Sequence, residues 1–67
     1  MIVYIITRER LYIGSEVMSV WRTQEAAEEE IKVLQEYYGG KWAVKGVSFW
    51  INDTETVLQI EAKLVRG

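Results

Sequence analysis

The sequence predicts an α+β domain in which a four-stranded, mainly antiparallel sheet carries one helix on one face, in the order ββαββ. Two patterns support this prediction. Several short stretches alternate apolar and polar residues, which is typical of strands, and one central segment repeats its apolar residues at helical spacing. At 67 residues, the chain is long enough for a single domain, residues 1–67, and no linker or internal repeat divides it.

The first two strands are predicted to form an antiparallel hairpin. Met1 to Thr7 is rich in β-branched residues and apolar at odd and even positions, which is typical of a strand central in its sheet or covered on both faces. Glu16 to Arg22 is the second strand candidate. Because the Gly14-Ser15 pair favours a bend, we expect the chain to reverse there through a fairly long loop.

The helix is predicted to begin after Thr23, whose hydroxyl can accept a hydrogen bond from an amide of the first turn. The apolar residues that follow share one helical face: Ala27, Ile31, Leu34 and Tyr38. The opposite face is charged. Gly39-Gly40 is expected to end the helix, since glycine adopts the left-handed C′ conformation without steric cost.

The remaining strands are predicted on either side of a polar turn. Residues 41–51 alternate with a change of phase at Gly46, and we expect a β-bulge at Lys45-Gly46 to absorb it. Asn52-Asp53-Thr54 fits the glycosylation acceptor pattern, but without a secretory signal an Asx-type turn is the better interpretation. Leu58 to Leu64 then alternates, so the last strand should have one dry and one wet face.

The composition argues against catalysis. The chain has no His, no Cys and no Pro, yet eight aromatic residues, three of them Trp. General acid–base work at neutral pH most often uses His, and the serines have no His to activate them. A zinc site without Cys or His would rest on carboxylates alone, which is uncommon. We therefore predict a protein that is not an enzyme, with no catalytic residue, metal or cofactor.

The charge and the N-terminus set expectations for partners and location. The formal net charge is −2, whereas a protein that neutralises phosphates normally has a basic excess, so nucleic acid is a disfavoured partner. The apolar N-terminal stretch lacks the flanks of a signal peptide and is too short to span a bilayer. The sequence predicts a cytoplasmic protein without a membrane partner.

The chain has more apolar side chains than one helix can cover on a sheet, which predicts that it associates with a partner. One helix can cover one face of a small sheet, but there are apolar side chains for two faces, from Met1 to Ile6, Met18, Val20, Trp21, Trp42 and Trp50. An uncovered face of this kind would form a patch typical of an interaction site. Small domains without disulfides or metals also gain from oligomerisation. We expect a homodimer through a sheet face or edge; the alternative is that these aromatics are simply core residues.

The candidate partner-binding residues combine arginine hydrogen-bond donors with aromatic anchors, as interface hot spots do: Arg8, Arg10, Tyr12, Trp42 and Trp50. An ordinary hairpin loop is the alternative for residues 8–12. A second candidate is the acidic helix face, which could imitate a nucleic-acid backbone to a basic partner: Glu25, Glu28, Glu29 and Glu36. The alternative there is a solvated helix surface.

A competing function is a small nucleic-acid-associated regulator. In that interpretation, sheet aromatics stack on bases and basic residues contact phosphate, the former being Tyr4, Trp42 or Trp50 and the latter Arg8, Arg10, Lys41 and Lys45. Salt separates the two functions, because phosphate contacts weaken steeply as salt rises and a hydrophobic protein interface does not.

Three segments together resemble a group of small, uncharacterised bacteriophage and prophage accessory proteins. These segments are the strand Val3 to Thr7, the strand-to-helix junction Val20 to Glu28, and the strand led by Trp42. Trp21 stands where Phe is usual in that group. The resemblance brings no catalytic residues. It implies a phage-encoded protein in the host cell cytoplasm, where some such proteins bind and inhibit a host enzyme or defence component, so the expected partner is a host protein of unknown identity.

Overall fold

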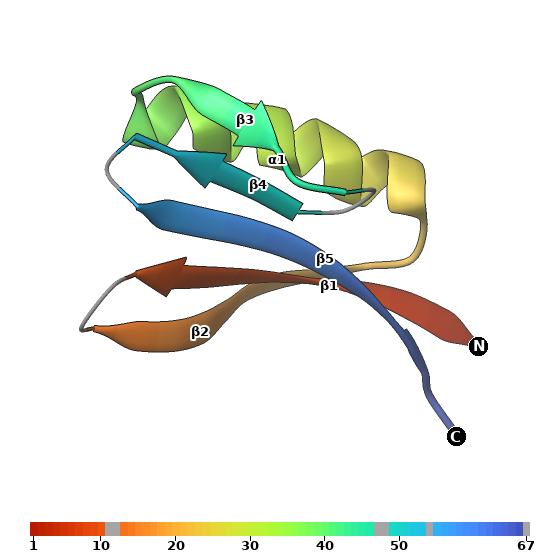
Figure 1. Cartoon of the computed structure of the whole chain (residues 1–67). Coiled ribbons are helices and arrows are strands. Elements are labelled where there is room, and N and C mark those ends of the chain that lie inside the picture. The colour runs from red at the N-terminus through yellow and green to blue at the C-terminus, as the bar shows by residue number, and fades with distance from the viewer. Residues whose placement is uncertain (11–12, 47–48, 54, 67) are drawn as a thin grey trace.

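The computed structural model describes residues 1–10, 13–46, 49–53 and 55–66, and within them it has five strands and one helix. In chain order these are β1 (Ile2–Arg10), β2 (Gly14–Trp21), α1 (Gln24–Tyr38), β3 (Trp42–Val44), β4 (Phe49–Asn52) and β5 (Thr56–Leu64). The strands form one antiparallel sheet in the order β2-β1-β5-β4-β3, and α1 lies along one side of it (Figure 1). The α+β class is confirmed.

The prediction of four strands was wrong, because residues 41–51 form two strands rather than one. β3 pairs with β4 antiparallel, with Ala43 opposite Ile51. The Lys45 amide donates to the Phe49 carbonyl oxygen over 2.8 Å, and Gly46 has a φ of +86°, a left-handed conformation that glycine adopts readily. The chain therefore reverses near Gly46 instead of bulging at Lys45-Gly46. Val47 and Ser48 lie outside the described residues.

The N-terminal hairpin is confirmed, with a longer first strand than predicted. The predicted bend at Gly14-Ser15 was wrong, because both residues belong to β2 and pair with the end of β1. β1 lies between β2 and β5, so it is central in the sheet. Because β1 continues to Arg10, Arg8 and Arg10 belong to a strand rather than to a loop. The register shifts between Ile6, which faces Ser19, and Thr7, which faces Val17, so the hairpin contains a bulge.

The helix begins and ends at the predicted residues, although Gly39, with φ +70° and ψ −166°, does not have the left-handed helical conformation that was expected. The Thr23 hydroxyl accepts a 3.1 Å hydrogen bond from the Ala26 amide, which satisfies one free donor of the first turn. At the other end the Gly39 amide donates to the Gln35 carbonyl oxygen over 2.9 Å. These two residues set the length of α1 and hence the area of sheet that it covers.

The structure has the predicted polar turn between β4 and β5, and the side chain of Asn52 bonds to residues on both sides of it. This residue is only 5% exposed; its Oδ1 accepts from the Thr56 amide over 2.8 Å, and its Nδ2 donates to the Gly39 carbonyl oxygen over 3.3 Å. Thr54, the third residue of the predicted turn, lies outside the described residues. Asn52 thus joins the end of α1 to the start of β5.

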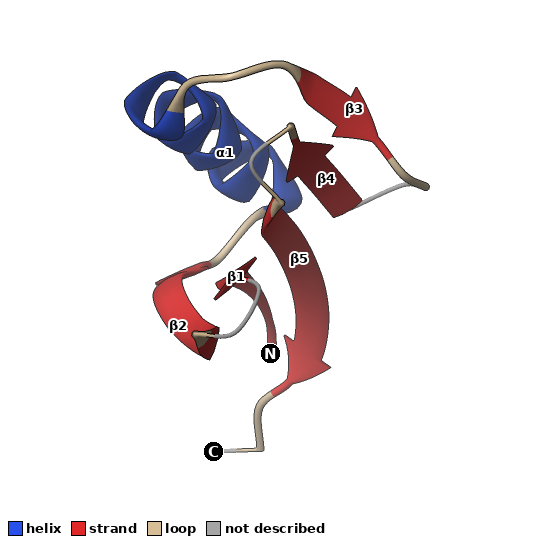
Figure 2. Cartoon of the chain, turned by 60° about the vertical axis from the view of Figure 1, so that its left-hand side comes forward, coloured by secondary structure: helices blue, strands red, loops and turns tan. Residues whose placement is uncertain are grey.

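The core lies between the sheet and α1. Its buried residues are Ile6 from β1, Ala27 and Ile31 from α1, and Leu58 and Ile60 from β5. All three tryptophans, Trp21, Trp42 and Trp50, pack against this cluster and are half-buried. No described helix or strand covers the opposite side of the sheet, which Figure 2 shows with α1 on one side only.

Candidate functional site

The two faces of the sheet can be assigned from the strand register. Successive side chains of a strand point to opposite faces, and residues paired across strands point to the same face. Ile6 and Ile60 are paired and buried against α1, so the neighbours Ile5 and Glu61, which are also paired, point away from the helix. We call this uncovered side the open face.

The open face is rich in aliphatic side chains. Its apolar residues, taken strand by strand, are Val17 and Val20 of β2, Val3 and Ile5 of β1, Val57 of β5, Phe49 and Ile51 of β4, and Ala43 of β3. Val17 and Val20 are 63% and 56% exposed. Gln59 and Glu61 of β5 lie on the same face, between the apolar residues of β2 and β1 and those of β4 and β3. Apolar side chains that a sheet leaves uncovered are typical of interaction sites.

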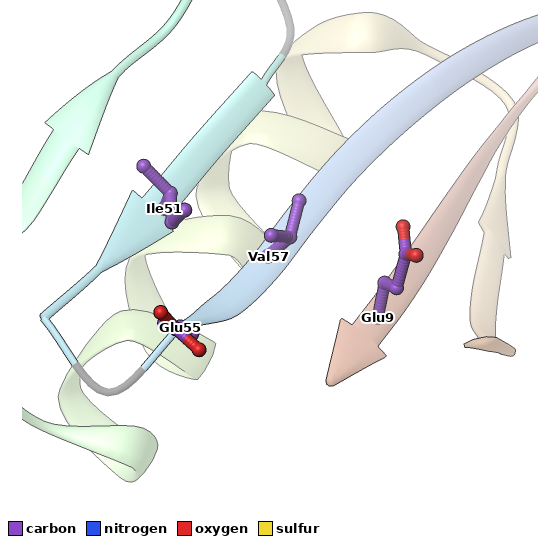
Figure 3. Close-up of a pocket in the computed structure, with 4 residues that line it drawn as sticks. All are labelled: Glu9, Ile51, Glu55 and Val57. Carbon is purple, nitrogen blue, oxygen red and sulfur yellow. The ribbon is translucent and has the colours of Figure 1, made fainter. Parts of the chain in front are cut away.

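One end of the open face contains a hollow of about 250 Å³, lined by Glu9, Ile51, Glu55 and Val57. Figure 3 shows Ile51, Val57 and Glu9 on the neighbouring strands β4, β5 and β1, with the helix behind the sheet. The register agrees, because Val57 pairs with Ile51 on one side and with Glu9 on the other. The hollow therefore combines two aliphatic side chains with two carboxylates.

The other end of the open face carries a cation. Lys63 of β5 pairs with Val3 of β1 and is exposed. At about 3.3 Å per residue, Lys63 lies about 20 Å along β5 from Val57. The open face is thus acidic at the hollow and has Lys63 at its other end, and its middle mixes aliphatic side chains with Thr7, Gln59 and Glu61.

Arg8, a predicted partner-binding residue, lies on the helix side of the sheet and makes contacts within the chain. Its Nη1 donates to the Tyr38 hydroxyl over 2.7 Å, and its Nη2 forms an ion pair with Glu16. The guanidinium carbon lies 5.5 Å from the centroid of the Tyr38 ring, within the range of a cation–π contact. Arg10 is exposed at the end of β1, and Tyr12 lies outside the described residues.

Trp42 and Trp50 also lie on the helix side. The Trp42 indole Nε1 donates to the Gln35 carbonyl oxygen over 3.2 Å, and Trp50 pairs with the buried Leu58. The structure therefore brings Arg8, Trp42 and Trp50 to the covered side of the sheet, where all three are half-buried. Phe49 and Ile51 take the open side instead, and their alternation with Trp50 is the signal that could have identified them.

The acidic helix face faces solvent for most of its length. Glu25, Glu29 and Glu36 are exposed and Glu28 is half-buried. Glu28 accepts a hydrogen bond from Gln24 over 3.2 Å, and Glu29 lies 3.5 Å from the Lys32 ammonium. Exposed pairs of this kind contribute little to stability, so these contacts suit a solvated helix surface.

The described residues contain no cluster of three or more potential metal ligands among His, Cys, Asp and Glu. Within the same residues, α1 is neither long nor apolar enough to cross a membrane. No protein-family model, curated protein or solved structure matches the chain.

Proposed function

We propose that this chain is a non-enzymatic protein-interaction module that binds through its open face. The observation that carries the proposal is the uneven cover of the sheet: α1 packs on one side, while apolar residues of all five described strands lie on the uncovered side. Removal of apolar surface from water contributes about 25 cal/mol per Å², so a partner that covers this face gains a substantial driving force.

The resemblance to bacteriophage accessory proteins indicates the kind of partner. For a phage-encoded module, the partner is a host protein in the host cell cytoplasm, and binding inhibits or modulates it. The open face suits this role because it offers a preformed, rigid surface that needs no ordering on binding. Arg10 is exposed at the end of β1 but shares the side of Arg8 and Ile6, so it points to the helix side and not to the open face.

The competing nucleic-acid function draws less support from the same contacts. Stacking on bases needs free aromatic faces, whereas Trp42 and Trp50 pack against the core and Trp42 donates its indole N–H to the helix. Of the four cations considered for phosphate contacts, Arg8 already binds Tyr38 and Glu16, whereas Arg10, Lys41 and Lys45 are exposed.

A capture experiment with matched variants tests the proposal. The double variant Val17→Lys/Val20→Lys places charge on the open face at two exposed positions, so the fold should tolerate it. The control is Val33→Lys, since Val33 is 59% exposed on α1, away from the open face. We expect tagged wild-type protein and the Val33→Lys variant to recover the same host protein, and the double variant to recover roughly tenfold less, a difference of about 1.4 kcal/mol in binding.

Equal recovery by all three proteins would contradict binding through the open face. The capture is repeated at high salt and after nuclease treatment. Recovery that is lost under either condition would favour the nucleic-acid function, because phosphate contacts weaken with salt and an apolar interface does not.

A further inference from the structure

Val57 and Lys63 of β5 mark the two ends of the open face, on opposite sides of its centre. Ile6 of β1 and Ile60 of β5 are paired at the centre of the sheet. Along β5, Val57 and Lys63 lie equally far from Ile60 on opposite sides, and along β1 the same holds for Glu9 and Val3. The hollow thus occupies one end, and Lys63 occupies the matching position at the other end.

A two-fold rotation exchanges these ends. Consider two copies packed with their open faces together. The two-fold axis lies between the sheets, perpendicular to the strands, and passes over the Ile6–Ile60 pair. Position 63 of one copy then lies over position 57 of the other. Such an interface is self-complementary, so each contact occurs twice. Sheets packed this way lie about 10 Å apart with strands about 30° from parallel, so an extended lysine of one sheet meets the side chains that project from the other.

The hollow has the chemistry that a lysine side chain requires. A lysine has an apolar stem and a charged head, and the stem can lie on apolar surface while the ammonium reaches polar groups. Ile51 and Val57 provide the apolar surface, and Glu9 and Glu55 provide two carboxylates. At about 250 Å³ the hollow is smaller than the roughly 300–1,000 Å³ of small-molecule sites, so it suits one side chain better than a free ligand.

We propose that the open face binds a second copy of this chain, in a face-to-face dimer where Lys63 of each copy enters the partner's acidic hollow. This inference rests on the proposed function, because it takes the open face as the binding surface. A second copy and a host protein then compete for that face. In the same arrangement Gln59 meets Glu61, so an amide donor faces a carboxylate. On β1, Ile5 of each copy meets Thr7 of the partner near the centre, and Val3 meets the stem of Glu9.

Charge and size both favour a second copy in this orientation. A face that met its copy with the two hollows together would oppose four carboxylates, whereas the rotated arrangement sets each acidic end against a lysine. β1 and β5 have nine residues and β2 has eight, whereas β3 and β4 have only three and four. At about 3.3 Å per residue and about 4.8 Å between strands, the face covers roughly 500 Å². The face is therefore of the same order as the ~800 Å² that each partner contributes to a standard interface.

A charge-swap experiment tests this dimer by sedimentation at micromolar concentrations. We expect the wild-type chain to sediment as a dimer. Lys63→Glu alone, and Glu9→Lys/Glu55→Lys alone, should each raise the dimer dissociation constant at least tenfold, because each sets like charges together. An equimolar mixture of the two variants should restore dimers, since every lysine then again meets carboxylates. Lys32→Glu on the helix, where the side chain is 71% exposed, is the control and should leave the dimer unchanged.

The outcomes separate this inference from the proposed function. A wild-type monomer, or a dimer that Lys63→Glu leaves intact, overturns the inference. If in that case Val17→Lys/Val20→Lys still abolishes capture of a host protein, the open face remains the binding surface and only its occupant was misassigned. If that double variant changes neither capture nor sedimentation, the proposed function fails as well. Far-ultraviolet circular dichroism checks that each variant is folded.

Discussion

Arg8 donates a 2.7 Å hydrogen bond to the hydroxyl of Tyr38, and this contact ties the sheet to the last turn of the helix. The two residues are far apart in the sequence, Arg8 in β1 and Tyr38 at the end of α1. The Arg8 side chain is only 19% exposed and also pairs with Glu16 of β2. One cation therefore joins three elements on the covered side of the sheet, which is why it is not available as a surface anchor.

Replacement of the Tyr38 hydroxyl should weaken the fold. Tyr38→Phe keeps the ring beside the guanidinium but removes the acceptor of a partly buried charged donor, so we expect the free energy of unfolding to fall by about 1–2 kcal/mol. Urea denaturation measures it. The control is Tyr37→Phe, since Tyr37 is 80% exposed and meets Tyr38 only through its ring edge. Equal losses for both variants would show that the Arg8–Tyr38 bond contributes nothing.

Substitution of Asn52 should destabilise the fold more than substitution of its exposed neighbour Asp53. Asn52→Ala leaves the buried Thr56 amide without its side-chain acceptor and removes the donor to Gly39, so we expect a loss of about 2–3 kcal/mol. Asn52→Asp keeps an acceptor for Thr56 and should recover part of the loss. Hydrogen exchange at the Thr56 amide reports this contact directly.

The control for Asn52 is Asp53→Ala at an exposed position. Exchange at Thr56 should accelerate in Asn52→Ala and stay unchanged in Asp53→Ala. Unchanged exchange in Asn52→Ala would mean that the side chain does not hold the turn.

The parts of the fold that depend on local chemistry could be predicted from the sequence. Thr23 and Gly39 end the helix through bonds to residues three or four positions away, so the sequence pattern contains both partners. The number of strands could not be predicted in this way. A bulge and a chain reversal at Gly46 produce the same phase shift, and only the pairing of β3 with β4 decides between them.

The candidate site, like the fold, could be predicted only in part from the sequence. The sequence contains more apolar residues than a single helix can cover, which predicts one uncovered sheet face. The structure has such a face. Strand register decides which residues form that face. The large size of the tryptophans makes them candidates for an interaction surface, but their positions in the alternation of each strand put Trp42 and Trp50 on the helix side. Trp50 lies opposite Leu58 and thus toward the helix, so the smaller Phe49 and Ile51 take the open side.

The reversal at Gly46 makes a prediction of its own. A Cβ at Gly46 would meet no atom within 4 Å, so Gly46→Ala tests the left-handed backbone alone. We expect a loss of about 1–2 kcal/mol for Ala and a smaller loss for Gly46→Asn, because asparagine tolerates this conformation better. Thermal and urea unfolding measure both. Equal losses for the two variants would indicate that another feature of residue 46 matters more than its φ.

Two neighbouring isoleucines of β1 distinguish the two faces of the sheet. Ile6 is fully buried against α1, whereas Ile5 is half-buried and points to the open face. Ile6→Ala should cost about 2–5 kcal/mol at any protein concentration, because it leaves a cavity in the core. Ile5→Ala should cost about 1 kcal/mol in dilute protein and more as the concentration rises, since association buries the side chain only in the dimer. Urea unfolding at nanomolar and at high micromolar protein measures both. If Ile5→Ala costs as much as Ile6→Ala in dilute protein, side chains of the same chain already bury the open face, and no partner is needed to cover it.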